Sequence, residues 1–436
     1  MRILHSISIY AISTLINALV RFAILAVGAR VLLLEDYGAL DTLLFIGLAL
    51  SSLIIMGYDS AVLRLSFGPE AKDRHQSSLL ANALSLILAN AFLFTVISVL
   101  VVPFLNHSAL RMESSILIAC CISFGVGFSL IAVSSANLRA HFEEKRFLAA
   151  TLICAIIRVG GLLPFLKFGP ISLQTFMVTV STCYLLSGLV FVTSNKKWLE
   201  KPKLDKELMR QMINFGIPIG AVVVMAGAFP LIERLIVLHT SDITQLSIYA
   251  ASAFPAMALG VAIQIVNLAW TPLALKSLDT SDKIETFIGK SAMIFQGAFI
   301  ILYVMLLFSS EYVVEVFVPI GIEGSSRFFP FIGLVVLVRF TSTFTGFGLI
   351  VEKRTYVKAL INAMGLIIGG TGSLMIGSRF GVGAIPITLF VFSYFTFVLE
   401  AFIARKYAPQ IIVPYKRMAL LILMTSILAS LYVSFS

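Results

Sequence analysis

The sequence alternates between long apolar runs and short polar loops from one end to the other. Each apolar run is long enough to cross a bilayer as an α-helix, which satisfies its own backbone hydrogen bonds as lipid requires. The alternation typical of membrane-barrel strands is absent. The pattern predicts thirteen membrane-spanning helices, at residues 7–33, 39–66, 79–104, 114–139, 147–168, 171–194, 211–239, 246–275, 286–309, 327–351, 356–378, 383–404 and 416–435.

The amino-acid composition also indicates a helical membrane protein. Hydrophobic residues make up 59% of the chain, charged residues 12%, and the mean hydropathy is +1.01, whereas a soluble domain carries about 25% charged residues. We therefore expect an all-α polytopic membrane protein. The four cysteines lie in apolar runs and the five histidines are scattered, so neither a metal site nor a cofactor site is indicated.

The loops predict the orientation. Of the 32 Lys and Arg residues, 22 lie at the side that holds the N-terminus, six lie within helices, and four lie in the opposite loops: Arg111, Lys167, Arg327 and Arg379. Because basic loops stay in the cytoplasm, we expect a cytoplasmic N-terminus. Basic loops that face an anionic leaflet also account for the net charge of +10, without a nucleic-acid partner.

The chain contains an internal duplication. Four matches share nearly one offset, 208 to 213 residues: Glu144-Lys145-Arg146 with Glu352-Lys353-Arg354, Lys167 with Arg379, Tyr37 with Tyr249, and Arg21 with Arg234. Six helices return a chain to its starting side, so the repeats have the same topology. We predict two six-helix lobes, residues 1–194 and 211–404, around a central cleft. A cytoplasmic linker (195–210) joins them, and residues 405–436 add a cytoplasmic loop and an extra C-terminal helix.

Several predicted helices contain charged or amide side chains. In the seventh helix, Glu233 and Arg234 stand within an apolar decamer, where an Arg costs about 2.5–3.5 kcal/mol on insertion scales. Such residues usually face a protein interior or a wet cavity. The alternative is an interfacial ion pair that reaches out of the membrane.

A polar stripe runs along the first helix. Tyr10, Thr14, Asn17 and Arg21 fall on one helical face. A stripe of this length predicts a cavity lining, and the alternative is a hydrogen-bonded seam between helices.

The other candidates are single residues or pairs. Asp59 and Arg64 share the second helix, and Arg64 is close enough to the cytoplasmic end to snorkel. Arg158 and Arg339 lie at helix centres, where a packing role is the alternative. Gln264 and Asn267 share a face of the eighth helix and could equally join helices. Near the cytoplasmic end of the twelfth helix, Glu400 lies close to Arg405, and we interpret it as structural.

The deep charges are mostly positive. Arg21, Arg64, Arg158, Arg234 and Arg339 outnumber the deep acids, which are Asp59, Glu233 and, as a third candidate, Asp41. A cationic cleft of low dielectric attracts anions, and a guanidinium matches phosphate oxygens bidentately. We therefore expect an anionic substrate, with phosphate the natural group. Asp59 and Glu233 are the candidates for coupling to H⁺ or Na⁺.

Several short motifs follow one another in an order typical of a known family. "NFGIPIG" precedes the Glu233-Arg234 pair, and "IYAASAF" and "NLAWTPLALK" follow it. This succession, together with the duplication, resembles the polysaccharide-transport branch of the multidrug/oligosaccharidyl-lipid/polysaccharide (MOP) exporters. Closest are the Wzx-type O-antigen flippases. The resemblance covers about residues 7–404.

The resemblance implies a function. Such a protein flips an undecaprenyl-pyrophosphate-linked oligosaccharide across the bacterial inner membrane by alternating access, in the biosynthesis of O-antigen and lipopolysaccharide. The implied partners are the lipid-linked glycan, membrane lipid, a polysaccharide polymerase and a chain-length regulator.

Two other function classes compete with this one. A drug or cation exporter of the same superfamily should favour buried acids over arginines. A membrane polymerase or glycosyltransferase should carry its chemistry on large outer loops. The longest predicted outer loop, 310–326, contains only Glu311, Glu315 and Glu323 as acids, a pattern typical of a solvated surface. Because no nucleotide fingerprint or nucleophile triad is found, we do not expect an enzyme.

Overall fold

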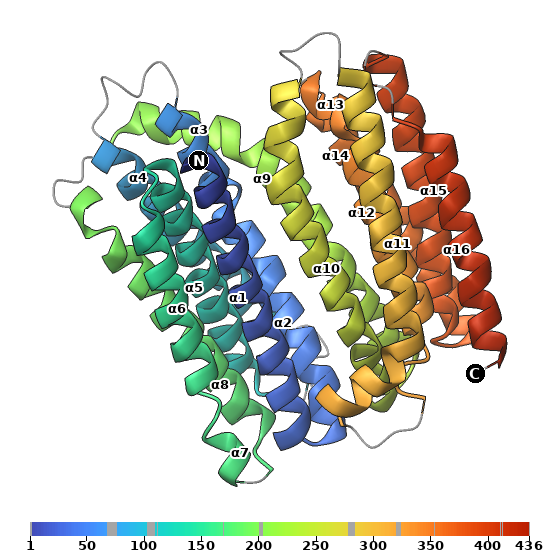
Figure 1. Ribbon diagram of the computed structural model, residues 1–436. Coiled ribbons are helices and arrows are strands. Elements are labelled where there is room, and N and C mark those ends of the chain that lie inside the picture. The colour runs from blue at the N-terminus through green and yellow to red at the C-terminus, as the bar shows by residue number, and fades with distance from the viewer. Residues whose placement is uncertain are drawn as a thin grey trace. The chain divides into compact units, whose positions relative to one another are not determined.

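The computed structural model describes residues 2–67, 76–102, 110, 112–168, 170–199, 204–277, 284–319, 324–352, 354–409, 411 and 413–435. All regular elements in these residues are helices (Figure 1). Twelve of the described helices are long and apolar enough to cross a membrane, and Phe329–Thr345 is a shorter apolar helix. These are the thirteen helices that the hydrophobic pattern predicts, so the all-α multi-pass fold class is confirmed.

The chain divides into two compact units, residues 1–231 (unit 1) and 232–436 (unit 2). Unit 1 contains α1 (Arg2–Val31), α2 (Leu34–Ile55), α3 (Tyr58–Phe67), α4 (Gln76–Val101), α5 (Ser114–Ala140), α6 (Glu144–Gly160), α7 (Phe165–Phe168), α8 (Leu173–Ser194), the 3-10 helix η4 (Lys196–Trp198) and most of α9 (Lys206–Thr240). Helix α5 packs against α2, α3, α4 and α8, and α1 packs along α6. The lobe boundaries expected from the duplication stay a prediction.

Unit 2 begins inside α9. Its other helices are α10 (Ile243–Ser277), α11 (Ile284–Phe317), α12 (Phe329–Thr345), α13 (Phe347–Val351), α14 (Thr355–Phe380), α15 (Ala384–Tyr407) and α16 (Tyr415–Phe435). Helix α12 packs against α10, α11, α15 and α16, and α14 runs along α15. Large aromatic side chains fill the core, and Trp270 stands edge-on to Phe344 and Phe347.

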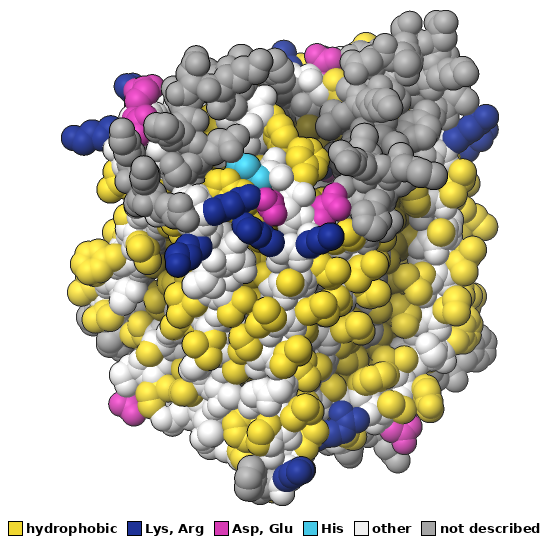
Figure 2. Space-filling model, turned by 60° about the vertical axis from the view of Figure 1, so that its left-hand side comes forward, with side chains coloured by type: hydrophobic (Ala, Val, Ile, Leu, Met, Phe, Trp, Pro, Cys, Tyr) yellow, Lys and Arg dark blue, Asp and Glu magenta, His cyan; other side chains and the backbone are white. Residues whose placement is uncertain are grey.

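The surface has the polarity that a bilayer requires. On the face shown in Figure 2, hydrophobic side chains cover the middle of the helices, whereas Lys and Arg side chains gather nearer to the helix ends. Exposed apolar residues along single helices, such as Leu420, Met424 and Ile427 of α16, fit contact with lipid tails.

The second predicted helix, 39–66, is wrong in one respect: it is broken into α2 and α3. Met56 and Gly57 have φ of 42° and 74°, in the left-handed region that ends a helix. The break packs against α9. A Cβ atom added at Gly216 would lie 2.9 Å from the Met56 carbonyl oxygen, and one added at Gly220 would lie 2.5 Å from the Met56 carbonyl carbon. The "NFGIPIG" motif therefore places two glycines against this break.

Other helix ends also differ from the prediction. Residues 147–168 form α6 and the short α7, and 327–351 form α12 and α13. Helix α11 continues to Phe317, so Glu311 and Glu315 are exposed side chains on its last turns, not loop residues. Glu323 lies outside the described residues. Asp205 caps the start of α9: its Oδ1 accepts hydrogen bonds from the backbone N–H groups of Glu207 (2.9 Å) and Leu208 (3.3 Å).

Candidate functional site

The deep acid–arginine pair of α9 is buried in unit 2. Arg234 Nη1 lies 3.1 Å from Glu233 Oε2, and the two residues are only 4% and 6% exposed. From α10, the Tyr249 hydroxyl donates a hydrogen bond of 3.4 Å to the same carboxylate oxygen. The Arg234 guanidinium stands 5.6 Å from the centroid of the Tyr249 ring. Glu233 and Arg234 thus form an interior ion pair and do not snorkel outward.

Helix α12 adds a second arginine to this group. Arg339 interacts electrostatically with Glu233, Arg234 and Tyr249. The four side chains, here called the unit 2 charged group, bring two guanidinium groups around one carboxylate. Three predicted site residues therefore meet, and Tyr249 is a member that the site prediction missed. Its match with Tyr37 in the duplication was the available signal.

Unit 1 holds Arg158 in a different way. Its Nη2 donates a hydrogen bond of 2.8 Å to Asn17 Oδ1, and its Nε donates one of 3.0 Å to the Cys154 carbonyl. The guanidinium also lies 5.1 Å from the centroid of the Tyr184 ring. Arg158 is 4% exposed. Its hydrogen bonds go to neutral acceptors, so its charge is not neutralised by them.

The polar stripe of α1 has two parts. Asn17 donates to the Ser13 carbonyl and accepts from Arg158, so at this position the structure shows a seam between α1 and α6. Thr14 donates to the Tyr10 carbonyl of its own helix. One turn beyond Asn17, Arg21 is half-buried and stands 5.9 Å from the centroid of the Phe128 ring. Asn17 and Arg158 are thus brought together in unit 1, whereas Arg21 contacts Phe128.

Asp59 and Arg64 point to different neighbours. Asp59 lies in the first turn of α3, where the helix dipole favours a carboxylate, and it interacts electrostatically with Arg139 of α5. Arg139 was counted among the loop cations, so sequence reasoning missed this partner. Arg64 is exposed, and its guanidinium lies 4.3 Å from the centroid of the Phe215 ring on α9.

The two amides of α10 lie away from the unit 2 charged group. Gln264 and Asn267 are 15 and 18 residues beyond Tyr249 on the same helix, a separation of about 22–27 Å along its axis. Gln264 is exposed and Asn267 is half-buried.

A second acid is buried in unit 2. Glu400 of α15 is 2% exposed, and its Oε1 lies 3.1 Å from Lys358 Nζ of α14. Lys358 also donates a hydrogen bond of 3.4 Å to the Ser342 carbonyl on α12. Arg405, five positions further along the same helix, points in a different direction from Glu400. The pair of Lys358 and Glu400 ties three helices together.

A comparison with protein-family models assigns the chain to a family. A model of the family described as "Polysaccharide biosynthesis protein" matches residues 3–277, more than half of the chain. The chain belongs to this family. Among curated proteins, no sequence matches it.

Solved structures show which fold this family member has. An inward-facing multidrug resistance MATE family transporter of the MOP superfamily is 14% identical, covers 90% of this chain and 94% of its own, and superposes with a TM-score of 0.66. The outward-facing conformation of such a transporter is 15% identical, covers 92% of this chain and 94% of its own, and has a TM-score of 0.63. A MATE transporter in the straight conformation is 14% identical, covers 92% of this chain and 95% of its own, and has a TM-score of 0.58. At such identities the likeness concerns the fold. The chain is thus a polysaccharide biosynthesis family member with the fold of the MATE transporters of the MOP superfamily.

Proposed function

We propose that this polysaccharide biosynthesis protein is a flippase. It moves an oligosaccharide linked to undecaprenyl pyrophosphate from the inner to the outer leaflet of the bacterial cytoplasmic membrane. The family assignment supports the polysaccharide pathway, and the MOP fold supports transport. The arginines inside membrane-spanning helices support an anionic head group.

The observation that carries the proposal is the charge of the unit 2 charged group. Glu233 and Arg234 are paired in a helix long enough to span a membrane, and Arg339 of the shorter apolar helix α12 interacts electrostatically with the same carboxylate. An intramembrane ionisable residue is expensive and is usually retained for function. A pyrophosphate offers oxygens in the geometry that arginine binds bidentately, and a low dielectric strengthens the attraction. The excess positive charge therefore suits a lipid pyrophosphate.

In unit 1 the proposal assigns different roles to the two neighbouring arginines. Arg21 is half-buried against Phe128, so its guanidinium can reach a ligand. Arg158 donates hydrogen bonds to Asn17 and to the Cys154 carbonyl, and we propose that its positive charge attracts the anionic head group without direct contact. The exposed Arg64 and Gln264 and the half-buried Asn267 are further candidates for contact with the head group or its sugars.

Ion coupling, if this transporter uses it, falls to Asp59 in our proposal. Glu233 is held by Arg234 and by the Tyr249 hydroxyl. Glu233 is therefore the counter-ion of the unit 2 charged group. Asp59 stands at a helix N-terminus beside Arg139, and we assign the contact with a coupling ion to this carboxylate.

The test is complementation of a flippase-deficient strain, read as surface glycan at matched protein levels. Arg21→Gln and Arg339→Gln should each lower surface glycan at least tenfold. Arg327→Gln and Arg379→Gln remove the same charge from exposed positions and should leave glycan unchanged. Normal glycan with both Arg21→Gln and Arg339→Gln would overturn the proposal.

Arg234 needs a paired design, because Arg234→Gln breaks the buried ion pair with Glu233 and can lower activity through stability alone. The double variant Glu233→Gln/Arg234→Gln removes both charges and keeps polar groups of similar size. If the arginine binds substrate, the double variant folds and remains inactive. If the pair only stabilises the fold, the double variant regains transport.

Drug export is the second candidate, favoured by the fold shared with multidrug MATE transporters. It predicts that deleting the gene sensitises cells to cationic compounds and leaves surface glycan intact. Our proposal predicts the reverse. Uptake of a fluorescent cationic dye and staining of surface glycan in the same deletion strain separate the two functions.

A further inference from the structure

The last two helices of unit 2 enclose a cavity that the transport proposal does not use. It has a volume of about 420 Å³ and is lined by the C-terminal end of α15, the start of α16, Thr345 at the end of α12, Gly348 of α13, and the connecting residues Ala408, Pro409, Ile411, Val413 and Pro414. Helix α16 lies outside the duplicated part of the chain, so the repeat assigns it no task.

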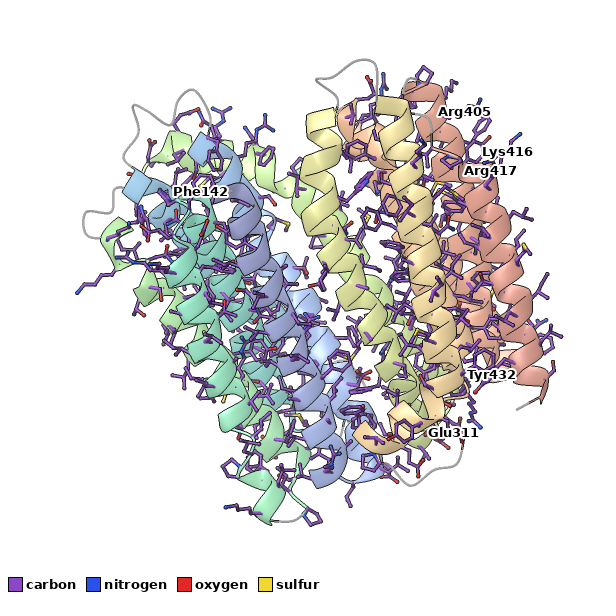
Figure 3. All side chains as sticks on the ribbon, viewed as in Figure 1. Phe142, Glu311, Arg405, Lys416, Arg417 and Tyr432 are labelled. Carbon is purple, nitrogen blue, oxygen red and sulfur yellow. The ribbon has the colours of Figure 1, made fainter. Side chains whose placement is uncertain are left out.

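Three basic side chains line this cavity. Arg405 comes from the last turn of α15, and Lys416 and Arg417 come from the first turn of α16. The three are labelled at the same end of these two helices in Figure 3. Tyr415 helps to orient Arg405, whose Nη1 donates to the tyrosine hydroxyl over 3.5 Å. No acidic residue is among the described residues that line the cavity.

The position of two of these cations is unfavourable unless an anion is present. The first turn of α16 contains Lys416 and Arg417 and no acidic residue. A helix N-terminus carries partial positive charge and favours anions, so cations placed there repel it. An anion held among Arg405, Lys416 and Arg417 would offset this repulsion.

The remainder of the cavity wall is apolar. Ala401, Ala404 and Ala408 of α15 present small side chains, and that leaves the space open. From Lys416 and Arg417, exposed Leu420, Met424 and Ile427 follow at intervals of three or four residues along α16. Such spacing makes one continuous apolar stripe that starts beside the cations. A phosphate at the cavity and acyl chains on the stripe describe a phospholipid.

We propose that this cavity binds the phosphate of an anionic membrane phospholipid through Arg405, Lys416 and Arg417. The bound lipid anchors α16 to the rest of unit 2 and neutralises the cations at its first turn. The loop bias predicts that this end of the helices faces the cytoplasm, where anionic lipids attract basic side chains. This inference does not depend on what the protein transports.

The experiment uses the purified full-length protein, delipidated in a neutral detergent. Binding of phosphatidylglycerol, phosphatidylcholine and inorganic phosphate is measured by native mass spectrometry. We expect retention of phosphatidylglycerol in preference to phosphatidylcholine, and no retention of inorganic phosphate. Each of Arg405→Gln, Lys416→Gln and Arg417→Gln should weaken phosphatidylglycerol binding about fivefold, and the triple variant roughly 100-fold.

Two further variants make the test specific to the cavity. Lys406→Gln removes the same charge from the same turn of α15 but lies outside the cavity lining, so binding should change by less than twofold. Ala404→Leu keeps all charges and fills the cavity, so binding should weaken at least fivefold. Should the triple variant not fold, the single variant at the exposed Lys416 decides.

Three results would overturn the proposal. Equal binding of phosphatidylcholine would show that the cations do not select the lipid. Retention of inorganic phosphate with affinity equal to that of the lipid would identify a free-anion site. A loss of binding with Lys406→Gln as large as with Lys416→Gln would reduce the effect to general surface charge. None of these readouts requires transport, so failure here is distinct from failure of the flippase proposal.

Discussion

Arg158 of α6 and Asn17 of α1 are joined by a hydrogen bond of 2.8 Å between Nη2 and Oδ1. The guanidinium is buried, and its Nε is held by the Cys154 carbonyl of its own helix. Where lipid surrounds the helices, hydrophobic burial does not drive helices together, so polar contacts and close packing have to do so. The bond therefore fixes α1 against α6 and, one turn along α1, sets the position of Arg21.

The first prediction concerns this bond. Arg158→Gln and Asn17→Ala should each destabilise unit 1, because a buried partner is left without its hydrogen bond. Interhelical hydrogen bonds in membrane proteins are worth about 0.6–1.7 kcal/mol. A double-mutant cycle of unfolding free energy in detergent should therefore return a coupling energy in that range. Strictly additive effects would mean that the bond contributes nothing.

Close packing at the break between α2 and α3 gives a second prediction. Gly216→Ala or Gly220→Ala would push a Cβ atom into the Met56 backbone, which cannot rotate away as a side chain can. Overpacking of this kind costs about 1–3 kcal/mol. Gly260 and Gly297 lie in helices with no described heavy atom near the added Cβ atom. At these two control positions Ala should be neutral or stabilising by up to about 1 kcal/mol.

The measurement is the melting temperature of the purified variants in one detergent. Both Gly216→Ala and Gly220→Ala should melt below the parent, and Gly260→Ala and Gly297→Ala at or above it. Equal melting temperatures for all four would contradict the close approach of α9 to Met56.

A third prediction concerns pH. Glu143, between α5 and α6, accepts a hydrogen bond from Lys197, and Arg146 lies 3.6 Å from its other oxygen. The hydrogen bond from Lys197 is the largest cause that lowers the pKa of this carboxyl below its ordinary value of 4.5. A lowered folded-state pKa means that the carboxylate stabilises the fold above pH 4.5, and that this contribution is lost as pH falls through the folded-state value.

Melting curves of the parent and Glu143→Gln between pH 7 and pH 3 provide the check. The parent should be slightly more stable at pH 7, by about 0–1 kcal/mol as for surface ion pairs, and the difference should vanish in acid. Lys197→Gln removes the same pair from its cationic side and should flatten the pH dependence equally. A gap that widens as pH falls would reverse the assigned sign.

The sequence was sufficient to predict the thirteen helices, because apolar runs of this length are typical of membrane-spanning helices and not of loops. It also identified Glu233 and Arg234, since neighbouring charges in an apolar run are rare in membrane helices. It could not show that Arg339 joins them, because the register between α9 and α12 depends on side-chain packing. The sequence did not predict the break at Met56 for a related reason: the break packs against Gly216 and Gly220, some 160 residues away in sequence.

Helix ends were the other weak point. Arg139 lies on the last turn of α5, and the loop-based count treated it as solvated, yet it interacts with Asp59. Hydropathy reports that a helix ends near a residue but not which neighbour the side chain meets. The partner of Glu400 was missed for the same reason, since Lys358 belongs to another helix.

The pair of Lys358 and Glu400 supports a final prediction. Removing one partner, by Lys358→Met or Glu400→Gln, leaves a buried polar group or charge, and breaking such pairs typically costs about 3–5 kcal/mol. Replacing both, by Lys358→Met with Glu400→Leu, removes both desolvation penalties and should recover most of that loss. The free energy of unfolding in detergent should therefore show strong non-additivity.

If the pair serves only to join α14 to α15, the double variant should also transport normally in the glycan assay. A double variant that is stable but inactive would instead place Glu400 in the transport cycle, beside Asp59 as a second candidate for ion coupling.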